Sequence, residues 1–142
     1  MAGSRLMCTF MVGDLYCGLE VERVQEVISY RRLTRVPLAP PEVLGLINLR
    51  GEIVTAIDLR RRLRLDSAAP AEEPMNVVAR GEDGAFSFVV DRIEDVVELE
   101  RDDFEATPET LDDGIRHLVQ GVCKVEERLL LLLDVDRLLE LD

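Results

Sequence analysis

The chain has 142 residues, of which 47% are hydrophobic and 32% charged, and its formal net charge is −12. This length and composition suit one compact domain, or two small lobes that share a core. The acidic balance argues against nucleic-acid binding, which depends on neutralising phosphates. Because no apolar run approaches the roughly 20 residues of a membrane-spanning helix, we expect no insertion into a membrane.

The first segment predicts a β-hairpin. Apolar residues alternate on both sides of Gly13-Asp14, which places glycine at the first central position of a two-residue turn. This turn pairs Phe10 with Cys17, so Cys8 is not opposite Cys17 and no disulfide is expected across the hairpin. Since the N-terminus reads as a strand rather than a signal peptide, we expect a cytoplasmic location.

The segment after the hairpin carries apolar residues near helical spacing, which predicts one or two helical turns over residues 21–28. A matching apolar set follows at 93–97. Each set is interpreted either as core or as the lining of a groove, and the sequence favours neither. The residues concerned are Val24, Val27 and Ile28 in the first set, and Ile93, Val96 and Val97 in the second.

Two strands are predicted next, at about 46–50 and 52–57, with Gly51 in the tight connection. Asp58 is expected to cap a short helix. Four arginines between positions 60 and 64 are interpreted mainly as a solvated helix face, with docking to an acidic surface as the alternative. Residues 1–64 carry a net charge of +3 and residues 65–142 a net charge of −15.

An internal repeat organises the chain. Residues 45–63 align with 121–139 without a gap, and 21–28 matches 90–97. We therefore expect two subdomains, about 10–65 and 75–142, with strand exchange at the termini as an option and a polar linker at 66–74. Many short strands with tight turns predict a mostly β fold of two five-stranded barrels with short helices.

The second copy is predicted to hold strands from 75 onward around a turn at 81–84, and a buried strand at 129–133. It is longer by seven residues, which fall within 101–117. There, Thr107-Pro108 is a helix start signal and Gly114 a stop signal. Asp134 is expected to cap the last helix.

The residues give no catalytic constellation. The three cysteines lack metal-ligand spacing, His117 has no ligand partner nearby, and no phosphate-binding loop or nucleophile elbow is present. We therefore expect no enzyme activity, no cofactor and no metal. One polar motif remains, Asn48-Leu49-Arg50-Gly51. It is interpreted either as a plain turn with a solvated arginine, or as an arginine held on a rigid strand end to meet a carboxylate.

Several motifs in order resemble the CheW family of bacterial chemotaxis coupling proteins. They are Phe10 with Gly13-Asp14, the run VERVQEV at 21–27, Val36-Pro37, GLINLRG at 45–51, DLR at 58–60, and LLLD at 131–134. The resemblance covers almost the whole chain. It implies two SH3-like barrels packed together, which agrees with the repeat, and it implies an adaptor without enzyme activity that is a monomer in isolation.

The resemblance also implies two partners: the regulatory domain of a CheA-type histidine kinase, and the cytoplasmic hairpin tip of chemoreceptors. Kinase contact is expected on the first barrel and receptor contact in the groove between barrels, at arrays on the inner face of the membrane. The implied contact residues are Val24, Glu26, Val27, Ile28, Gly45, Asn48, Leu49, Arg50, Gly51 and Val96, with an ion pair between Glu26 and Arg50 as a hypothesis.

Two alternatives stay open at this point. The chain could serve as a related adaptor in a motility or developmental signalling pathway, with different partners but the same kind of binding. It could also be an SH3-like module that binds nucleic acid through its arginine-rich first half, although the net charge of −12 and the scarcity of aromatic residues oppose this.

Overall fold

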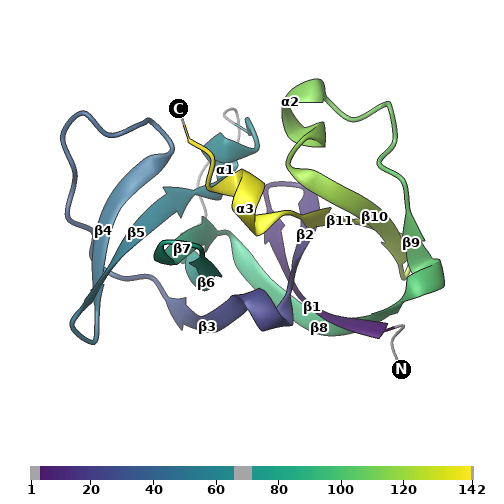
Figure 1. The fold of residues 1–142 in the computed structure, drawn as a ribbon, viewed down its shortest axis with the longest axis horizontal. Coiled ribbons are helices and arrows are strands. Elements are labelled where there is room, and N and C mark those ends of the chain that lie inside the picture. Colours follow the sequence, from purple (N-terminus) through teal and green to yellow (C-terminus); the bar gives the residue numbers. More distant parts are fainter. Residues whose placement is uncertain (1–3, 66–71, 142) are drawn as a thin grey trace.

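A computed structural model describes residues 4–65 and 72–141, which form two strongly curved β-sheets that stand side by side (Figure 1). The strands are β1 (Ser4–Val12), β2 (Leu15–Glu20), β3 (Val24–Ser29), β4 (Val43–Leu49), β5 (Glu52–Asp58), β6 (Met75–Gly81), β7 (Gly84–Val90), β8 (Arg92–Glu100), β9 (Phe104–Glu105), β10 (Val119–Val125) and β11 (Arg128–Leu133). The helices are α1 (Leu59–Arg62), α2 (Asp113–Arg116) and α3 (Val135–Leu138), with 3-10 turns η1 (Val21–Arg23) and η2 (Arg101–Asp103).

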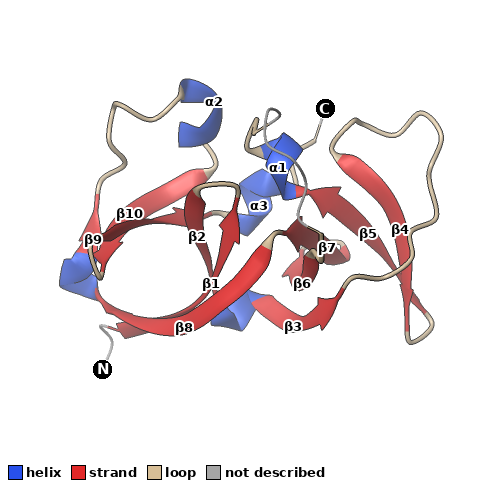
Figure 2. Cartoon of the chain, turned by 180° about the vertical axis from the view of Figure 1, so that it is seen from behind, coloured by secondary structure: helices blue, strands red, loops and turns tan. Residues whose placement is uncertain are grey.

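One sheet has six strands in the order β8-β1-β2-β11-β10-β9, and the other has five in the order β3-β6-β7-β5-β4. Most neighbours are antiparallel, but β2 pairs in parallel with β11 and β5 with β7. Figure 2 shows the strands curling into two barrel-like units with small helices between and above them. The predicted mostly β fold is therefore confirmed, with the two-residue strand β9 as a sixth member of one sheet.

The two sequence copies exchange hairpins. The β1–β2 hairpin of the first copy lies beside β11 of the second, and the β6–β7 hairpin of the second lies beside β5 of the first. The order β3-β6-β7-β5-β4 thus repeats as β8-β1-β2-β11-β10. Neither sheet coincides with the contiguous segments 10–65 or 75–142, and residues 66–71 of the expected linker lie outside the described residues.

The main core lies between the two sheets, where alternating residues of each strand face the opposite sheet. Phe10 and Leu19 from the six-stranded sheet pack with Val77 and Phe88 from the five-stranded sheet, and all four side chains are fully buried. The predicted hairpin register is confirmed, with Phe10 opposite Cys17. All three cysteines are free and buried.

The helical turns predicted over 21–28 are wrong for most of that segment, because β3 begins at Val24 and pairs with β6. The register shifts between Val24 and Glu26, so one extra residue bulges from the strand. That insertion moves the next inward apolar residue to Val27 and imitates the three-residue spacing of a helix.

The helix predicted between Thr107-Pro108 and Gly114 is also misplaced. Helix α2 begins after Asp112, whose carboxylate accepts a hydrogen bond from the amide of Gly114 at 2.8 Å. Gly114 therefore lies in the first turn rather than at the end. The guanidinium of Arg64 occupies the space that a Cβ at this position would take, with the nearest atoms at 2.7 Å.

Two arginines of the 60–64 cluster hold the molecule together, so their interpretation as a solvated face is wrong. Arg60 donates to the carboxylate of Asp91 at 3.0 and 2.7 Å, and the two side chains are only 14% and 18% exposed. Arg62 donates to the carbonyls of Arg137, Leu138 and Glu140 at the end of α3. Positive charge from the first copy thus anchors the second copy, whose helix end carries partial negative charge.

Candidate partner-binding site

The predicted Arg50 motif forms the turn between β4 and β5. Leu49 pairs with Glu52, which leaves Arg50 and Gly51 as the two turn residues, both with positive φ, +52° and +88°. The amide of Gly51 donates to the side-chain oxygen of Asn48 at 2.9 Å. A two-residue turn with both φ angles positive matches the twist of its strands, so Arg50 projects from a rigid support.

Arg50 makes a two-pronged ion pair with Glu26. Its two terminal nitrogens donate to the two carboxylate oxygens of Glu26 at 2.6 and 2.5 Å. This planar fork-to-fork geometry fixes the orientation of the guanidinium. The Arg50 side chain stays 68% exposed while Glu26 is 21% exposed, so the arginine keeps one edge for another molecule.

The ion pair joins the two edges of the five-stranded sheet. Glu26 lies on edge strand β3, whereas Arg50 follows edge strand β4. A second closure lies nearby, where Thr34 and Leu46 exchange backbone hydrogen bonds of 2.9 and 2.7 Å. Gly45 is required at this closure, because a Cβ there would lie 2.5 Å from the carbonyl oxygen of Thr34. Glycine therefore permits the close backbone approach that shuts the barrel.

The electrostatics of the site favour the charged forms of Glu26 and Arg50. Hydrogen bonds from Arg50 hold the pKa of the Glu26 carboxyl below its ordinary value of 4.5, with smaller help from the charge of Arg31. The same hydrogen bonds raise the pKa of Arg50. At neutral pH the guanidinium of Arg50 is therefore charged and is held in place by the carboxylate of Glu26.

Two of the predicted contact residues support the site from inside the barrel. Leu49 is 5% exposed and packs with Val54 and Val78, and Ile28 packs against the same cluster. Val24 is half-buried against the main core between the sheets. The structure thus does not bring Ile28 to the same surface as Val27, because successive residues of a strand point to opposite faces.

Val27 and Val96 are both exposed, at 37% and 59%. Val27 pairs with Val77 of β6, and Val96 pairs with Cys8 of β1, so both lie on the faces that the two sheets turn toward each other. The apolar layer between the sheets is therefore open along one side. Strands β3 and β8, which carry these valines, leave the junction between the sheets in different directions (Figure 1).

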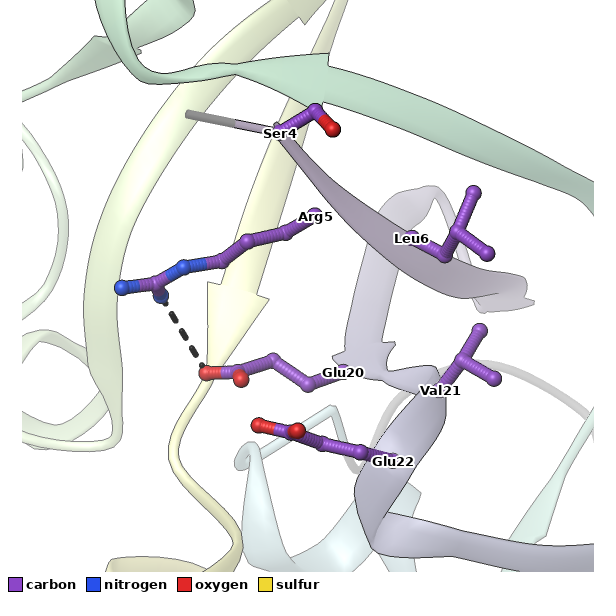
Figure 3. Close-up of a pocket in the computed structure, with 6 residues that line it drawn as sticks. All are labelled: Ser4, Arg5, Leu6, Glu20, Val21 and Glu22. Atoms are coloured by element: carbon purple, nitrogen blue, oxygen red, sulfur yellow. Dashed lines mark hydrogen bonds and ion pairs between the residues drawn. The ribbon is translucent and has the colours of Figure 1, made fainter. Parts of the chain in front are cut away.

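Sequence reasoning did not single out Ile53 as an exposed apolar residue. Ile53 is 59% exposed and lies opposite Asn48, next to the Arg50 turn. Leu6, which is half-exposed at the start of β1, lines a surface hollow together with the half-buried Val21 of η1 (Figure 3). Alternation along β5 could not have identified Ile53 as exposed, because Ile57 lies on the same face of the strand and is fully buried.

Within the described ranges, no group of three or more His, Cys, Asp or Glu side chains is placed to hold a metal ion. No helix in those same ranges is long and apolar enough to cross a membrane. The buried polar side chains serve the fold: Ser87 donates to Asn76 at 2.7 Å, and Asn76 donates to the carbonyl of Ser29 at 3.2 Å.

Comparison with known proteins agrees with this geometry. The family model for the CheW-like domain matches residues 6–142. The chain is 31% identical over 134 residues to the chemotaxis protein CheW of Rhizobium meliloti, covering 94% of this chain and 86% of that protein. It is also 31% identical over 133 residues to the chemotaxis protein CheW of Helicobacter pylori, covering 94% and 80%.

The fold matches a solved structure as well. The scaffolding protein TtCheW from Thermoanaerobacter tengcongensis superposes with a TM-score of 0.87 at 22% identity, over 99% of this chain and 90% of that one. The family model and the two relatives each account for almost the entire chain. Together with the paired β-sheets and the Arg50 turn, they show that this protein belongs to the CheW-like domain family.

Proposed function

We propose that this protein is a non-enzymatic adaptor that couples chemoreceptors to a CheA-type histidine kinase at cytoplasmic receptor arrays. The observation that carries the proposal is the exposed guanidinium of Arg50, fixed by both oxygens of Glu26 on a two-residue turn. A long side chain held in one orientation loses little conformational entropy on binding, so it suits recognition of a partner. Curated relatives named chemotaxis protein CheW support the same reading.

An adaptor must hold two partners at once, and strand β3 separates two suitable surfaces. Glu26 lies on the barrel side of β3 with Arg50, whereas Val27 lies on the side that faces the other sheet. We assign the Arg50 turn, with Asn48, Gly51 and exposed Ile53 around it, to the kinase regulatory domain. We assign the open side of the inter-sheet layer to the receptor.

The test is calorimetric titration of the chain with the regulatory domain of its cognate CheA-type kinase. Arg50→Glu replaces the fork with a carboxylate beside Glu26, and we expect it to weaken binding strongly. Arg50→Lys keeps the charge but loses the planar fork, so an intermediate loss is expected. Arg101→Glu, an exposed arginine of η2 in the other sheet, is the matched control and should bind as the unaltered chain does.

Thermal unfolding of each variant distinguishes the loss of a contact with the kinase domain from the loss of the folded structure. Saturable one-to-one binding that Arg50→Glu weakens, while the variant still unfolds well above the temperature of the titration, supports the assignment. Binding that survives Arg50→Glu and Arg50→Lys unchanged would remove Arg50 from the interface. If the unaltered chain binds no kinase domain at high micromolar concentration, the coupling function itself is wrong.

A further inference from the structure

The two barrels carry the same irregularity in their edge strands. In β3 the register with β6 shifts between Val24 and Glu26, and in β8 the register with β1 shifts opposite Thr9. The alignment that relates residues 21–28 to 90–97 also places one shift upon the other. Each edge strand therefore contains a β-bulge, a feature that re-aims the side chains around it.

The two bulges are held by different interactions. In β8 the hydroxyl of Thr9, which is fully buried, donates to the backbone carbonyl of Asp95 within the bulge. The equivalent position beside the β3 bulge is Val78, which pairs with Glu26 and has no hydroxyl. The β3 bulge is instead held through the side chain of Glu26 and its ion pair with Arg50.

These two anchors differ in strength. Losing a buried hydrogen bond leaves a buried polar group unsatisfied and is costly, whereas an ion pair at the surface contributes little. Arg50 is 68% exposed, so the anchor of the β3 bulge is open to water. The bulge in β3 is therefore the more easily altered of the two, until a partner covers Arg50 and excludes water from the ion pair.

The β3 bulge adjoins both surfaces to which we assigned a partner. Glu26 belongs to the Arg50 site, and Val27, the next residue of the strand, is exposed on the face toward the other sheet. Because a single planar peptide unit joins these two residues, restraining Glu26 also restrains the direction in which Val27 projects. The state of the bulge is therefore felt on both faces of β3.

We propose that the β3 bulge is a conformational coupling element, through which a partner bound at Arg50 raises the affinity of the opposite face of β3 for the second partner. The proposal rests on the coupling function proposed above, which supplies the two partners. A partner that orders Arg50 and Glu26 fixes the bulge, so the second partner meets an ordered strand and loses less conformational entropy on binding. Coupling of this kind is reciprocal, because each partner raises the affinity of the other by the same factor.

Hydrogen exchange of the chain without partners tests how the bulges are held. Arg50→Ala should speed exchange of the amides over residues 24–29 several-fold, because the bulge loses its anchor. The matched control is Arg128→Ala, which removes a 3.4 Å ion pair from the β8 bulge but leaves the hydroxyl of Thr9 in place. Exchange over residues 93–98 should then stay within about twofold of the unaltered chain. Equal acceleration in the two strands would overturn the proposal.

Exchanging the two anchors gives a second test in the same assay. Val78→Thr offers the β3 bulge the hydroxyl that Thr9 gives the β8 bulge, with little change in side-chain shape. Combined with Arg50→Ala, it should return exchange over residues 24–29 toward that of the unaltered chain. Thr9→Val is the converse change and should speed exchange over residues 93–98. Unchanged exchange in Thr9→Val would overturn the proposal even if Val78→Thr proves too unstable to study.

Titration with both partners tests the coupling itself. A cognate chemoreceptor cytoplasmic fragment should bind the unaltered chain several-fold more tightly when the kinase regulatory domain is saturating. Val78→Thr should largely abolish that increase by ordering the bulge beforehand, whereas Thr9→Val should retain it, because β8 contributes nothing to the Arg50 site. Independent binding of the two partners by the unaltered chain would overturn the coupling element and leave the adaptor function intact. Binding of neither partner would overturn both.

Discussion

The Arg60–Asp91 pair offers the sharpest test of how the two copies are joined. The Asp91 carboxylate accepts from Arg60 at 3.0 and 2.7 Å and from the amide of Gly13 at 2.7 Å. Asp91→Ala removes all three of these hydrogen bonds, two of which come from a guanidinium that is only 14% exposed. Breaking a fully buried pair costs about 3–5 kcal/mol, and the remaining exposure lowers our expectation to about 2–3 kcal/mol.

Urea unfolding measures this loss directly. With a slope of about 2 kcal/mol per molar, a loss of about 2–3 kcal/mol moves the midpoint down by about 1–1.5 M. Asp91→Asn keeps an oxygen acceptor and should show about half the shift. The control Asp113→Ala breaks the pair with Arg116, in which Asp113 is 95% exposed, and should cost less than about 0.5 kcal/mol. Equal midpoints for Asp91→Ala and Asp113→Ala would refute the claim that this pair ties the copies together.

Three further outcomes are expected. Gly45→Ala should lower Tm by on the order of 5–10 °C, because its Cβ would lie 2.5 Å from the carbonyl oxygen of Thr34; an unchanged Tm in a calorimetric scan would contradict this. Since Arg50 lowers the pKa of Glu26, the stability from that pair is present above pH 4.5 and is lost as the pH falls through the folded pKa. Urea unfolding of Glu26→Gln beside the unaltered chain should therefore show a difference at neutral pH that closes on acidification. Burial raises the pKa of the Cys17 thiol to about 12, so a thiol reagent at pH 8 should leave it unmodified until denaturant is added, as peptide mapping would show.

Local patterns predicted local features well. The Gly13-Asp14 turn set the hairpin register, and the aspartates before α1 and α3 cap their helices as expected, through hydrogen bonds of 3.0 and 3.2 Å. The hypothesis that Glu26 pairs with Arg50 is also confirmed as geometry. The turn and the caps could be predicted because each depends on neighbouring residues, whereas the Glu26–Arg50 pair joins distant segments and was suggested by the family resemblance.

What failed depends on pairing between distant segments. The bulge in β3 imitated helical spacing, and nothing within residues 21–28 reveals the partner strand β6 that corrects it. Arg60 and Arg62 looked solvated because their partners, Asp91 and the end of α3, lie far along the chain. Ile28 was expected in the groove with Val27, but in the strand that forms there successive residues point to opposite faces. Contact residues therefore need the sheet register before they can be assigned.

The exchanged hairpins also decide when the fold can form during synthesis. Tyr16 of β2 pairs with Leu130 of β11, so this hairpin leaves the ribosome long before its neighbour on that side has been synthesised. The apolar face of the hairpin also stays uncovered at first, because Phe10 belongs to the same core cluster as Phe88. Such distant pairings slow folding, and in the meantime they leave the apolar face of the hairpin exposed and prone to aggregation. Translation rate and early chaperone contact should therefore influence the yield of this protein more than the stability of either sheet alone.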